Sequence, residues 1–330
     1  MYLAGDIGGT KTVIGLFDPK RGSRDPIREE VFPSRNFGSL EQILDRFLGS
    51  DRPKIDAAAF GVAGPIIGGS CRTTNLPWEL DEEDLSVALG TKHCKLLNDL
   101  ESMAYGMLYL PESEMIPLNP DAGPRKKGNV AVLAAGTGLG EAFLFWDGHR
   151  YHTIATEGGH TDFAPQDVVE NDLLRFLIGR FGNHVSYERI LSGPGLFNVY
   201  SFMIERLCGS LHPKVAQALA EGEDPSAIVS ELGLSNADAI AKETLDLFCR
   251  IYGAEAGNMA LKILAVGGVM IGGGIAPKIL PVLKNGLFLQ SFLRKGRFAN
   301  FMKSLPLLLT TNPRVGIIGA AEYALEMASA

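Results

Sequence analysis

Residues 1–17 have the sequence MYLAGDIGGTKTVIGLF, in which an apolar run breaks at Asp6 into a Gly-Gly-Thr turn and then resumes as alternating apolar residues. Gly8 and Gly9 can adopt the positive backbone angles of a tight turn, so the pattern predicts a β-hairpin. Consecutive glycines also expose backbone N–H groups to an anion, with the Thr10 hydroxyl and the Lys11 ammonium nearby. The two interpretations are compatible, and the rest of the chain decides whether the second applies.

The composition limits the number of domains and the class of protein. A chain of 330 residues with 46% hydrophobic and 21% charged residues is an ordinary globular protein with room for two domains. The net charge of −7 argues against a general nucleic-acid binder. The four cysteines lack CxxC spacing, so we expect neither a disulfide framework nor a zinc site. Because no run approaches about 18 apolar residues, we expect a cytoplasmic protein without a membrane partner.

The chain contains an internal repeat. GDIGGTKTVIGLF at 5–17 lies without gaps on LAAGTGLGEAFLF at 133–145, and both segments have the pattern strand, Gly/Thr turn, strand. The Pro- and Gly-rich stretch 111–128 before the second copy indicates a linker or a long surface loop. A duplicated β-turn-β opening predicts two related α/β domains that face each other, each offering a Gly-rich turn to a shared cleft.

Strand-like and helix-like segments alternate elsewhere. Apolar runs predict strands, and apolar spacing of three and four predicts helices. The expected strands are 27–32, 55–62, 96–97 and 266–271, and the expected helices are 39–48, the segment from 100 to 108, much of 238–264, a helix opening at 275–277 and one near 318–327.

The glycine-rich segment Gly136 to Gly140 invites a dinucleotide-binding interpretation, but the context argues against it. In that fold a helix follows the glycines, whereas here Glu141 to Trp146 is aromatic-rich and strand-like. There is also no GxxxxGK[ST] motif, so hairpin turns would have to hold any phosphate. A third cluster, Gly272 to Gly274, is equally consistent with close backbone packing and with a flat surface for a nucleotide.

Three polar groups are harder to explain by folding alone. Asn98 and Asp99 stand where a strand ends and a helix begins, which is where α/β proteins place ligand groups. Glu157 and His160 flank two glycines, so a flexible backbone can point both side chains at one spot. Glu188 stands just before the segment LSGPGL. Taken alone, a loop such as 157–160 is more often an ordinary turn, and a residue such as Glu188 is more often a solvated side chain.

In combination, these motifs resemble the bacterial-type glucokinases of the hexokinase and actin-like ATPase superfamily over nearly the whole chain. The matching motifs are DIGGTKT at 6–12, GVAGP at 61–65, TNLPW at 74–78, LNDLE at 97–101, AAGTGLG at 134–140, EGGHTDFAP at 157–165, YERILSGPGL at 187–196 and GGVMIGGGIAPKIL at 267–280. The resemblance implies an α/β fold with two related domains of the actin-like ATPase (ribonuclease H-like) type around a central cleft. Residues 1–110, completed by about 312–330, would form the smaller domain and 111–311 the larger.

The resemblance also implies roles for individual residues. Asp99 matches the catalytic base, and the sugar-hydroxyl ligands are matched by Asn98, Asp99, Glu157, His160 and Glu188. The nucleotide-binding positions are matched by Asp6, Gly8, Gly9, Thr10, Lys11, Gly136, Thr137, Gly138, Gly273 and Gly274. Asp6 would also lie near Mg²⁺ without binding it directly.

The expected activity is phosphorylation of the glucose 6-hydroxyl with ATP as co-substrate, by a homodimer that binds no nucleic acid. We expect no structural zinc, because Thr161-Asp162-Phe163 stands where the related repressor, open-reading-frame and kinase group carries clustered cysteines.

Three alternatives to a glucokinase remain: a kinase for another hexose or amino sugar, a non-catalytic sugar-responsive regulator, and a structural ATPase. A regulator would carry a DNA-binding segment ahead of Asp6, and a structural ATPase does not explain the EGGH loop. ATP, ADP and polyphosphate all remain open as donors.

Overall fold

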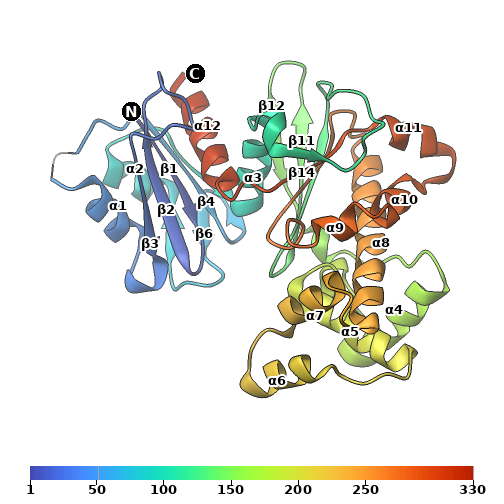
Figure 1. The fold of residues 1–330 in the computed structure, drawn as a ribbon. Helices are drawn as coiled ribbons and strands as arrows, with labels where there is room; N and C mark the ends of the chain where they lie inside the picture. Colours follow the sequence, from blue (N-terminus) through green and yellow to red (C-terminus); the bar gives the residue numbers. More distant parts are fainter. Residues whose placement is uncertain (51, 330) are drawn as a thin grey trace. The chain divides into compact units, whose positions relative to one another are not determined.

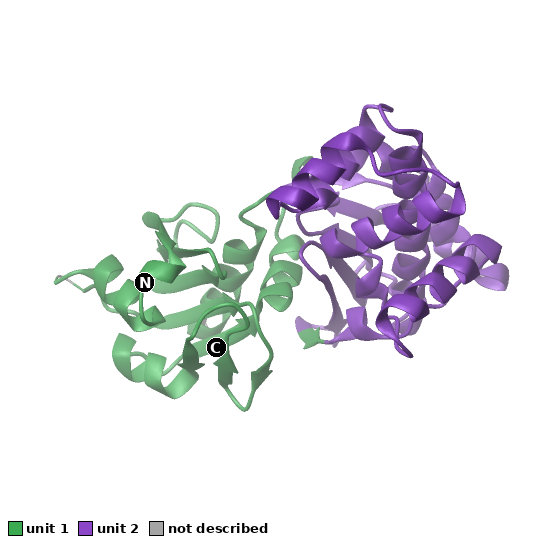
Figure 2. Cartoon of the chain, turned by 90° about the horizontal axis from the view of Figure 1, so that it is seen from below, with its two compact units in different colours: residues 1–114, 153–155, 312–330 green, residues 115–152, 156–311 purple. Residues whose placement is uncertain are grey.

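The computed structural model describes residues 1–50 and 52–329. They form two compact units (Figure 2). Unit 1 comprises residues 1–114, residues 153–155 and the C-terminal segment from 312, and unit 2 comprises residues 115–152 and 156–311.

Unit 1 is built on a five-stranded sheet with the order β3-β2-β1-β4-β8. Its strands are β1 (Tyr2–Ile7), β2 (Lys11–Phe17), β3 (Arg28–Pro33), β4 (Ala57–Val62) and β8 (Cys94–Asn98). The first three strands pair antiparallel, whereas β1, β4 and β8 run parallel, so Ile7, Val62 and Asn98 end three neighbouring strands at one edge. A small sheet of β5 (Ile66–Ile67), β6 (Ser70–Arg72) and β7 (Glu79–Asp81) follows β4.

Both faces of the unit 1 sheet are covered, because successive side chains of a strand point to opposite faces. Leu3 and Ile7 of β1 belong to a buried cluster that includes residues of α1, and Tyr2 and Ala4 belong to another that includes residues of α12. The helices of this unit are α1 (Leu40–Leu48), α2 (Glu82–Leu89), α3 (Asp99–Leu108) and α12 (Val315–Ser329), with short turns η1 (Ser34–Asn36) and η2 (Glu112–Glu114) (Figure 1).

Unit 2 carries a six-stranded sheet with the order β12-β11-β10-β13-β14-β9. Its strands are β9 (Met115–Pro117), β10 (Val130–Ala135), β11 (Leu139–Trp146), β12 (Tyr151–Ala155), β13 (Gly268–Gly272) and β14 (Leu307–Thr310). The hairpin β10–β11 has a parallel strand, β13, beside it, just as the hairpin β1–β2 has β4. The predicted duplication is therefore confirmed as a repeat of topology.

The helices of unit 2 gather mainly around α8 (Ala239–Lys262), which packs against α5, α7 and α10 (Figure 1). Leu245, Phe248, Ile251 and Tyr252 of α8 are buried, which confirms that this apolar stripe is core. The remaining helical elements are α4 (Val168–Phe181), α5 (Gly193–Arg206), α6 (Pro213–Glu221), α7 (Pro225–Leu234), α9 (Leu280–Leu283), α10 (Leu287–Leu293), α11 (Ala299–Ser304), η3 (Gly158–His160), η4 (Tyr187–Arg189) and η5 (Gly296–Phe298).

Two local predictions were wrong. The segment 111–128 is not wholly a linker, because Met115–Pro117 forms β9 and pairs antiparallel with β14 at the sheet edge. No helix opens at Ile275: the backbone N–H of Ile275 donates to the Ala135 carbonyl of β10 at 3.1 Å, and the chain turns until α9 begins at Leu280. In both places a tertiary hydrogen bond overrides the local pattern.

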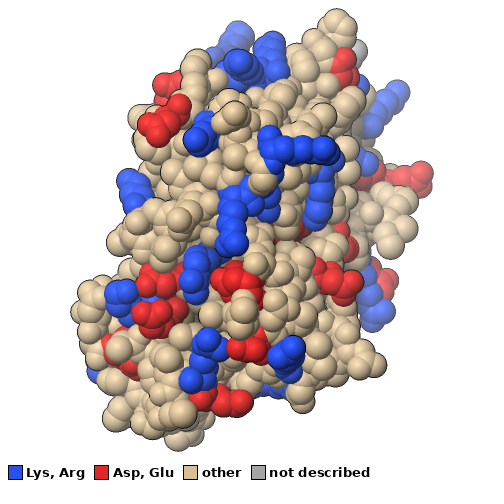
Figure 3. Space-filling view, turned by 90° about the vertical axis from the view of Figure 1, so that its right-hand side faces the viewer, with Lys and Arg blue, Asp and Glu red and all other residues tan. Residues whose placement is uncertain are grey.

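The surface carries mixed charge. On the face drawn in Figure 3, Lys and Arg predominate in the upper half, whereas Asp and Glu are more frequent in the lower half, among further Lys and Arg. In the described part of the chain, none of the helices has both the length and the apolar character that crossing a membrane needs.

Candidate active site

The first glycine turn joins β1 to β2 in unit 1. The Gly8 N–H donates to the Lys11 carbonyl at 3.0 Å and closes the turn. The Ser34 hydroxyl donates to the Gly8 carbonyl at 2.7 Å and lies 2.9 Å from the Thr12 hydroxyl. A Cβ on Gly9 would lie 2.6 Å from the Cβ of Asn75, so only glycine fits there. The turn is thus braced by Ser34 of η1 and by Asn75 of the segment TNLPW.

Asp6 lies in β1, between Val13 of β2 and Gly61 of β4. Burial and then the negative charge of Asp99 raise the pKa of Asp6 to about 6, while Lys11 opposes the shift. Asp99 follows the end of β8, two strands from β1, and begins α3. The parallel register therefore brings two carboxyl groups close enough to interact at one sheet edge.

Asn98 fixes the start of α3 through a capping box. Its side-chain carbonyl accepts from the Leu100 N–H at 2.9 Å, and the Glu101 carboxylate accepts from the Asn98 N–H at 3.0 Å. The Asn98 amide also donates to the Gly64 carbonyl at 3.0 Å, in the GVAGP loop after β4. Asp99 accepts from the Leu100 N–H at 2.9 Å and is exposed. A negative charge at this first turn interacts favourably with the helix dipole.

The second glycine turn, in unit 2, joins β10 to β11. The Gly136 N–H donates to the Gly138 carbonyl at 2.8 Å, and the Gly136 carbonyl accepts from the Gly193 N–H at 2.9 Å. A Cβ on Gly138 would lie 2.4 Å from a carboxylate oxygen of Glu188, which also accepts from the Leu139 N–H at 3.0 Å. Thr137 is exposed at the tip. The loop around η4 and the start of α5 therefore hold this turn from one side.

Glu157, His160 and Glu188 converge in unit 2. His160 Nε2 lies 3.9 Å from a Glu157 oxygen, and its Nδ1 lies 4.0 Å from a Glu188 oxygen. The side chains of Glu157 and His160 are 73% and 58% exposed, whereas that of Glu188 is 32% exposed. The structure thus brings together the three side chains that are expected to bind the sugar in this unit. Glu157 and His160 are exposed, whereas Glu188 is anchored by its hydrogen bond from the backbone of Leu139.

Gly273 and Gly274 follow β13 beside the second turn. Gly273 has a φ of 82°, and a Cβ there would lie 2.4 Å from the Ala135 carbonyl oxygen. A Cβ on Gly274 would meet nothing within 4 Å, so the space in front of it is open. Close packing therefore explains Gly273, while Gly274 presents bare backbone, as a nucleotide surface requires.

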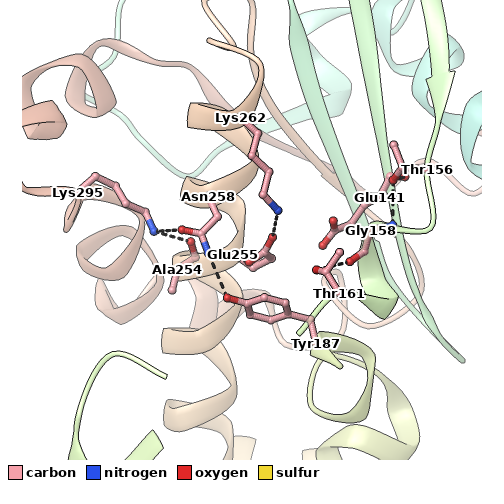
Figure 4. Close-up of polar contacts among 10 residues, drawn as sticks. All are labelled: Glu141, Thr156, Gly158, Thr161, Tyr187, Ala254, Glu255, Asn258, Lys262 and Lys295. Atoms are coloured by element: carbon pink, nitrogen blue, oxygen red, sulfur yellow. Dashed lines mark hydrogen bonds and ion pairs between the residues drawn. The ribbon is translucent and has the colours of Figure 1, made fainter. Parts of the chain in front are cut away.

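Sequence reasoning missed three supports of these groups: Asn75, the Ser192-Gly193 pair and Glu141. Ser192 caps α5 by accepting from the Gly195 N–H at 3.0 Å and donates to the Glu188 carbonyl at 2.7 Å. Glu141 lies in β11 beneath the Gly158 turn (Figure 4). The one available signal was an acidic residue inside an otherwise apolar strand, EAFLFW. The other two needed knowledge of tertiary contacts.

No group of three or more His, Cys, Asp or Glu side chains able to hold a metal occurs among residues 1–50 and 52–329. The Asp6 carboxylate is nevertheless suited to stand beside a hydrated hard cation, because carboxylate oxygens are ligands that Mg²⁺ and its bound waters prefer. The repulsion between Asp6 and Asp99, which contributes to the raised pKa of Asp6, is what a bound cation would relieve.

Comparison with known proteins identifies the family of the chain. The glucokinase family profile matches residues 3–327. A glucokinase of Nostoc punctiforme is 39% identical over 334 aligned positions, covering 97% of this chain and 98% of its own. A crystal structure of glucokinase from an Antarctic psychrotroph matches with a TM-score of 0.85 and 30% identity, covering 98% of each chain.

The crystal structure of a Balamuthia mandrillaris glucokinase in complex with glucose shares the fold, with a TM-score of 0.78, 21% identity and coverage of 100% of this chain and 93% of its own. The structural relatives place the chain in the actin-like ATPase fold. A match along almost the whole sequence and a relative at 39% identity establish the family. The chain therefore belongs to the glucokinase family.

Proposed function

We propose that the chain transfers the γ-phosphoryl group of ATP to the 6-hydroxyl of glucose, with Asp99 as general base, and releases glucose 6-phosphate and ADP. Asp99 would accept the proton of the glucose 6-hydroxyl while the oxygen of that hydroxyl attacks the γ-phosphorus. The bond between the γ-phosphorus and the ADP oxygen would break in the same step. The observation that carries the proposal is the placement of Asp99 at the end of β8 on a helix start fixed by the Asn98 capping box. A base on such a rigid element keeps its position without reorganisation.

The sugar would be held by Asn98 and Asp99 of unit 1 together with Glu157, His160 and Glu188 of unit 2. Carboxylates, an amide and an imidazole match a ring that presents several hydroxyls as donors and acceptors. The 73% exposure of Glu157 supports this role, since its carboxylate is available to a ligand. Polar groups that a bound sugar covers without offering them a hydroxyl would penalise the wrong sugar.

The nucleotide would be held by backbone. The turn Gly8-Gly9-Thr10 with Lys11, and the turn Gly136-Thr137-Gly138, would donate N–H groups and hydroxyls to the phosphates. Gly273 and Gly274 would face the adenosine. In support, both turns are closed by short backbone hydrogen bonds of 3.0 and 2.8 Å and are braced by neighbouring loops, so they are preorganised.

Asp6 would hold Mg²⁺ indirectly, through water, beside the phosphates. The cation, when bound, neutralises charge on the phosphoryl oxygens as transfer proceeds. Asp6 supplies negative charge at the sheet edge, and its pKa of about 6 means that it is ionised at neutral pH. Asp99 keeps the proton-accepting role.

The enzyme would have two domains. The smaller would consist of residues 1–110 and about 312–330, and the larger of residues 111–311. We further propose that it works in the cytoplasm as a homodimer, with glucose and ATP as its partners and with no structural zinc. These proposals rest on membership of the glucokinase family.

A coupled assay of ADP release tests the function. The purified chain is supplied with ATP, Mg²⁺ and, in turn, glucose, mannose, fructose, glucosamine or N-acetylmannosamine. Glucose should give the highest kcat/KM, and its product should be oxidised by glucose-6-phosphate dehydrogenase. A higher kcat/KM for another sugar would replace glucose as the substrate, and no sugar-dependent ADP release at all would refute kinase activity.

A further inference from the structure

Glu141 is a buried carboxyl group that the proposed reaction does not use. It lies in β11, its residue is 1% exposed, and neither side-chain oxygen has a hydrogen-bond partner among the described residues. A buried polar group without a partner is costly, so a group that persists in that state calls for a physical explanation.

Glu141 faces a second buried glutamate. Its carboxyl group points toward α8, where Glu255 and Lys262 lie (Figure 4). Glu255 is 0% exposed, and it accepts from the Asn258 amide at 2.8 Å and from the Lys262 ammonium at 3.3 Å. The Asn258 amide also donates to the Tyr187 hydroxyl at 3.1 Å. The charge of Glu255 is therefore compensated, whereas Glu141 has no cation of its own.

This arrangement decides which glutamate carries the charge. Two carboxylates that share one ammonium group in a buried site do not both ionise easily, so the better-bonded one takes the charge and the other keeps its proton. Burial and then the charge of Glu255 raise the pKa of Glu141 to about 8, while Lys262 opposes the shift. Glu141 is thus mainly a neutral carboxylic acid at pH 7.

Three other titratable groups interact with the pair, namely Tyr187, Tyr252 and Lys295. Tyr187 of η4 and Tyr252 of α8 face the glutamates, and burial raises the pKa of both above the ordinary tyrosine value. Lys295, before η5, donates to the Asn258 carbonyl at 2.5 Å and to the Ala254 carbonyl at 2.9 Å, and burial lowers its pKa. In this cluster, burial and the charge of Glu255 hold the Glu141 carboxyl group protonated, with a pKa of about 8.

Glu141 also supports the loop that carries Glu157 and His160. The Thr156 hydroxyl donates to the Glu141 backbone carbonyl at 2.8 Å and accepts from the Gly158 N–H at 3.0 Å. A Cβ on Gly158 would lie only 2.2 Å from a carboxyl oxygen of Glu141, so the loop backbone rests directly on this side chain (Figure 4). A charge on Glu141 would draw water or a proton donor into this contact.

We propose that Glu141 is a positioning residue for the sugar-binding loop, kept neutral by its buried partner Glu255, and that glucose affinity falls when Glu141 ionises. The inference rests on the proposed sugar-binding role of Glu157 and His160. The neutral acid fits beneath Gly158, whereas its carboxylate in the same place is desolvated without compensation and displaces residues 156–161. Alkaline pH thereby weakens the binding of sugar without touching the nucleotide turns.

The test compares wild type with Glu141→Gln, which keeps the shape and is neutral at every pH. Glucose affinity is measured by calorimetry, and the KM values for glucose and ATP by the coupled assay, from pH 6.5 to 9.5. For wild type we expect the glucose KM and Kd to rise about tenfold between pH 7 and 9.5, which corresponds to a change of about one unit in the pKa of Glu141 on sugar binding. Glu141→Gln should stay within about twofold throughout that range.

Glu170→Gln is the matched control. Glu170 is also buried, in α4, and burial raises its pKa, but its carboxylate accepts from the Gln166 N–H at 2.8 Å, outside residues 156–161. This variant should keep the alkaline rise of wild type. Glu255→Gln is a second test that does not depend on the folding of Glu141→Gln: without the competing charge, Lys262 favours ionised Glu141, and the alkaline rise should move to lower pH.

Superimposable pH profiles of glucose KM in wild type, Glu141→Gln and Glu255→Gln would overturn the proposal while leaving the kinase function intact. An equal rise in the KM of ATP would overturn it too, because the effect would then not belong to the sugar-binding loop. Absence of glucose binding by wild type at pH 7 would instead refute the proposed function and the positioning role together.

Discussion

At the residue scale, Glu188 links two parts of the candidate site in unit 2. One of its oxygens accepts from the Leu139 N–H at 3.0 Å, at the end of the second glycine turn, and the other lies 4.0 Å from His160 Nδ1. A carboxylate held by the backbone is a better-ordered ligand than one on a free side chain. Glu188 is therefore the fixed member of the group, whereas Glu157, with a side chain 73% exposed, is the adaptable one.

Glu157→Ala separates sugar binding from nucleotide binding. If Glu157 holds a ring hydroxyl, its removal should raise the glucose KM by roughly tenfold or more, the scale of a lost hydrogen bond to a charged group. The ATP KM should change much less, because no phosphate group is assigned to this side chain. Initial-rate kinetics with each substrate varied in turn measure both constants. An effect confined to ATP would remove the EGGH loop from the sugar site.

Residue roles that depend on local sequence were predictable, and those that depend on distant contacts were not. Asn98 and Asp99 could be placed at a strand end and helix start because the apolar spacing on both sides is visible in the sequence. The roles of Glu141 and Asn75 arise from contacts with Gly158 and Gly9, which only the folded chain brings near them. Whether the predicted ligands bind sugar stays a prediction.

At the scale of elements, the position of α3 depends on its crossing with α12. A Cβ on Gly106 would lie 2.0 Å from the Val315 carbonyl oxygen, and one on Gly319 would lie 1.8 Å from the Ser102 carbonyl oxygen. The Ser102 hydroxyl donates to the Gly316 carbonyl at 2.8 Å. Two glycines thus allow backbone-to-backbone approach, and through α3 this crossing places Asp99.

Gly106→Ala should force the two helices apart. We expect unfolding to become easier by about 2 kcal/mol or more, the usual cost of overpacking, and kcat to fall because α3 carries the proposed base. Urea denaturation and initial rates measure the two effects. Gly179→Ala in α4 is the control, since a Cβ there meets nothing within 4 Å and helix propensity predicts a gain of up to about 1 kcal/mol. Equal behaviour of the two variants would show that the crossing does not position Asp99.

Elements with strong periodicity were predicted closely, and elements created by pairing were not. Helix α1 begins after Ser39 and ends at Leu48, as the pattern 39–48 indicated. The short strand β9 has no distinctive pattern of its own and exists because β14 offers a pairing edge. The turns after Gly274 follow from the hydrogen bond of Ile275 to Ala135, which no local signal encodes.

At the scale of the whole molecule, Asp6 makes stability depend on pH. Its pKa is about 6 in the folded chain against 3.8 for the ordinary group, so between these values the folded state binds more protons than the unfolded state. Stability therefore falls as pH rises through this window, and the full cost is present above pH 6. Asp6→Asn should be more stable than wild type by about 3 kcal/mol at pH 7.5 and nearly equal to it below pH 4.

Denaturation midpoints at both pH values measure this difference, and kcat should fall in the same variant because the charge beside the phosphates is gone. The control is Asp25→Asn, an exposed carboxylate whose ion pair with Arg21 lowers its pKa, so its removal should give no gain at pH 7.5. A stability gain for Asp6→Asn that is the same at both pH values would show that ionisation of Asp6 is not its cause.

If Asp99 is the general base of a glucose kinase, Asp99→Asn should separate the binding of glucose from the transfer of the phosphoryl group. Asparagine keeps the size and one acceptor oxygen of aspartate but cannot take the proton, so glucose should still bind in calorimetry with an affinity within a few-fold of wild type. The rate of glucose 6-phosphate formation in a single turnover should fall by about 10² to 10⁴, the usual contribution of a positioned base. A variant that binds glucose and transfers the phosphoryl group at close to the wild-type rate would contradict the account.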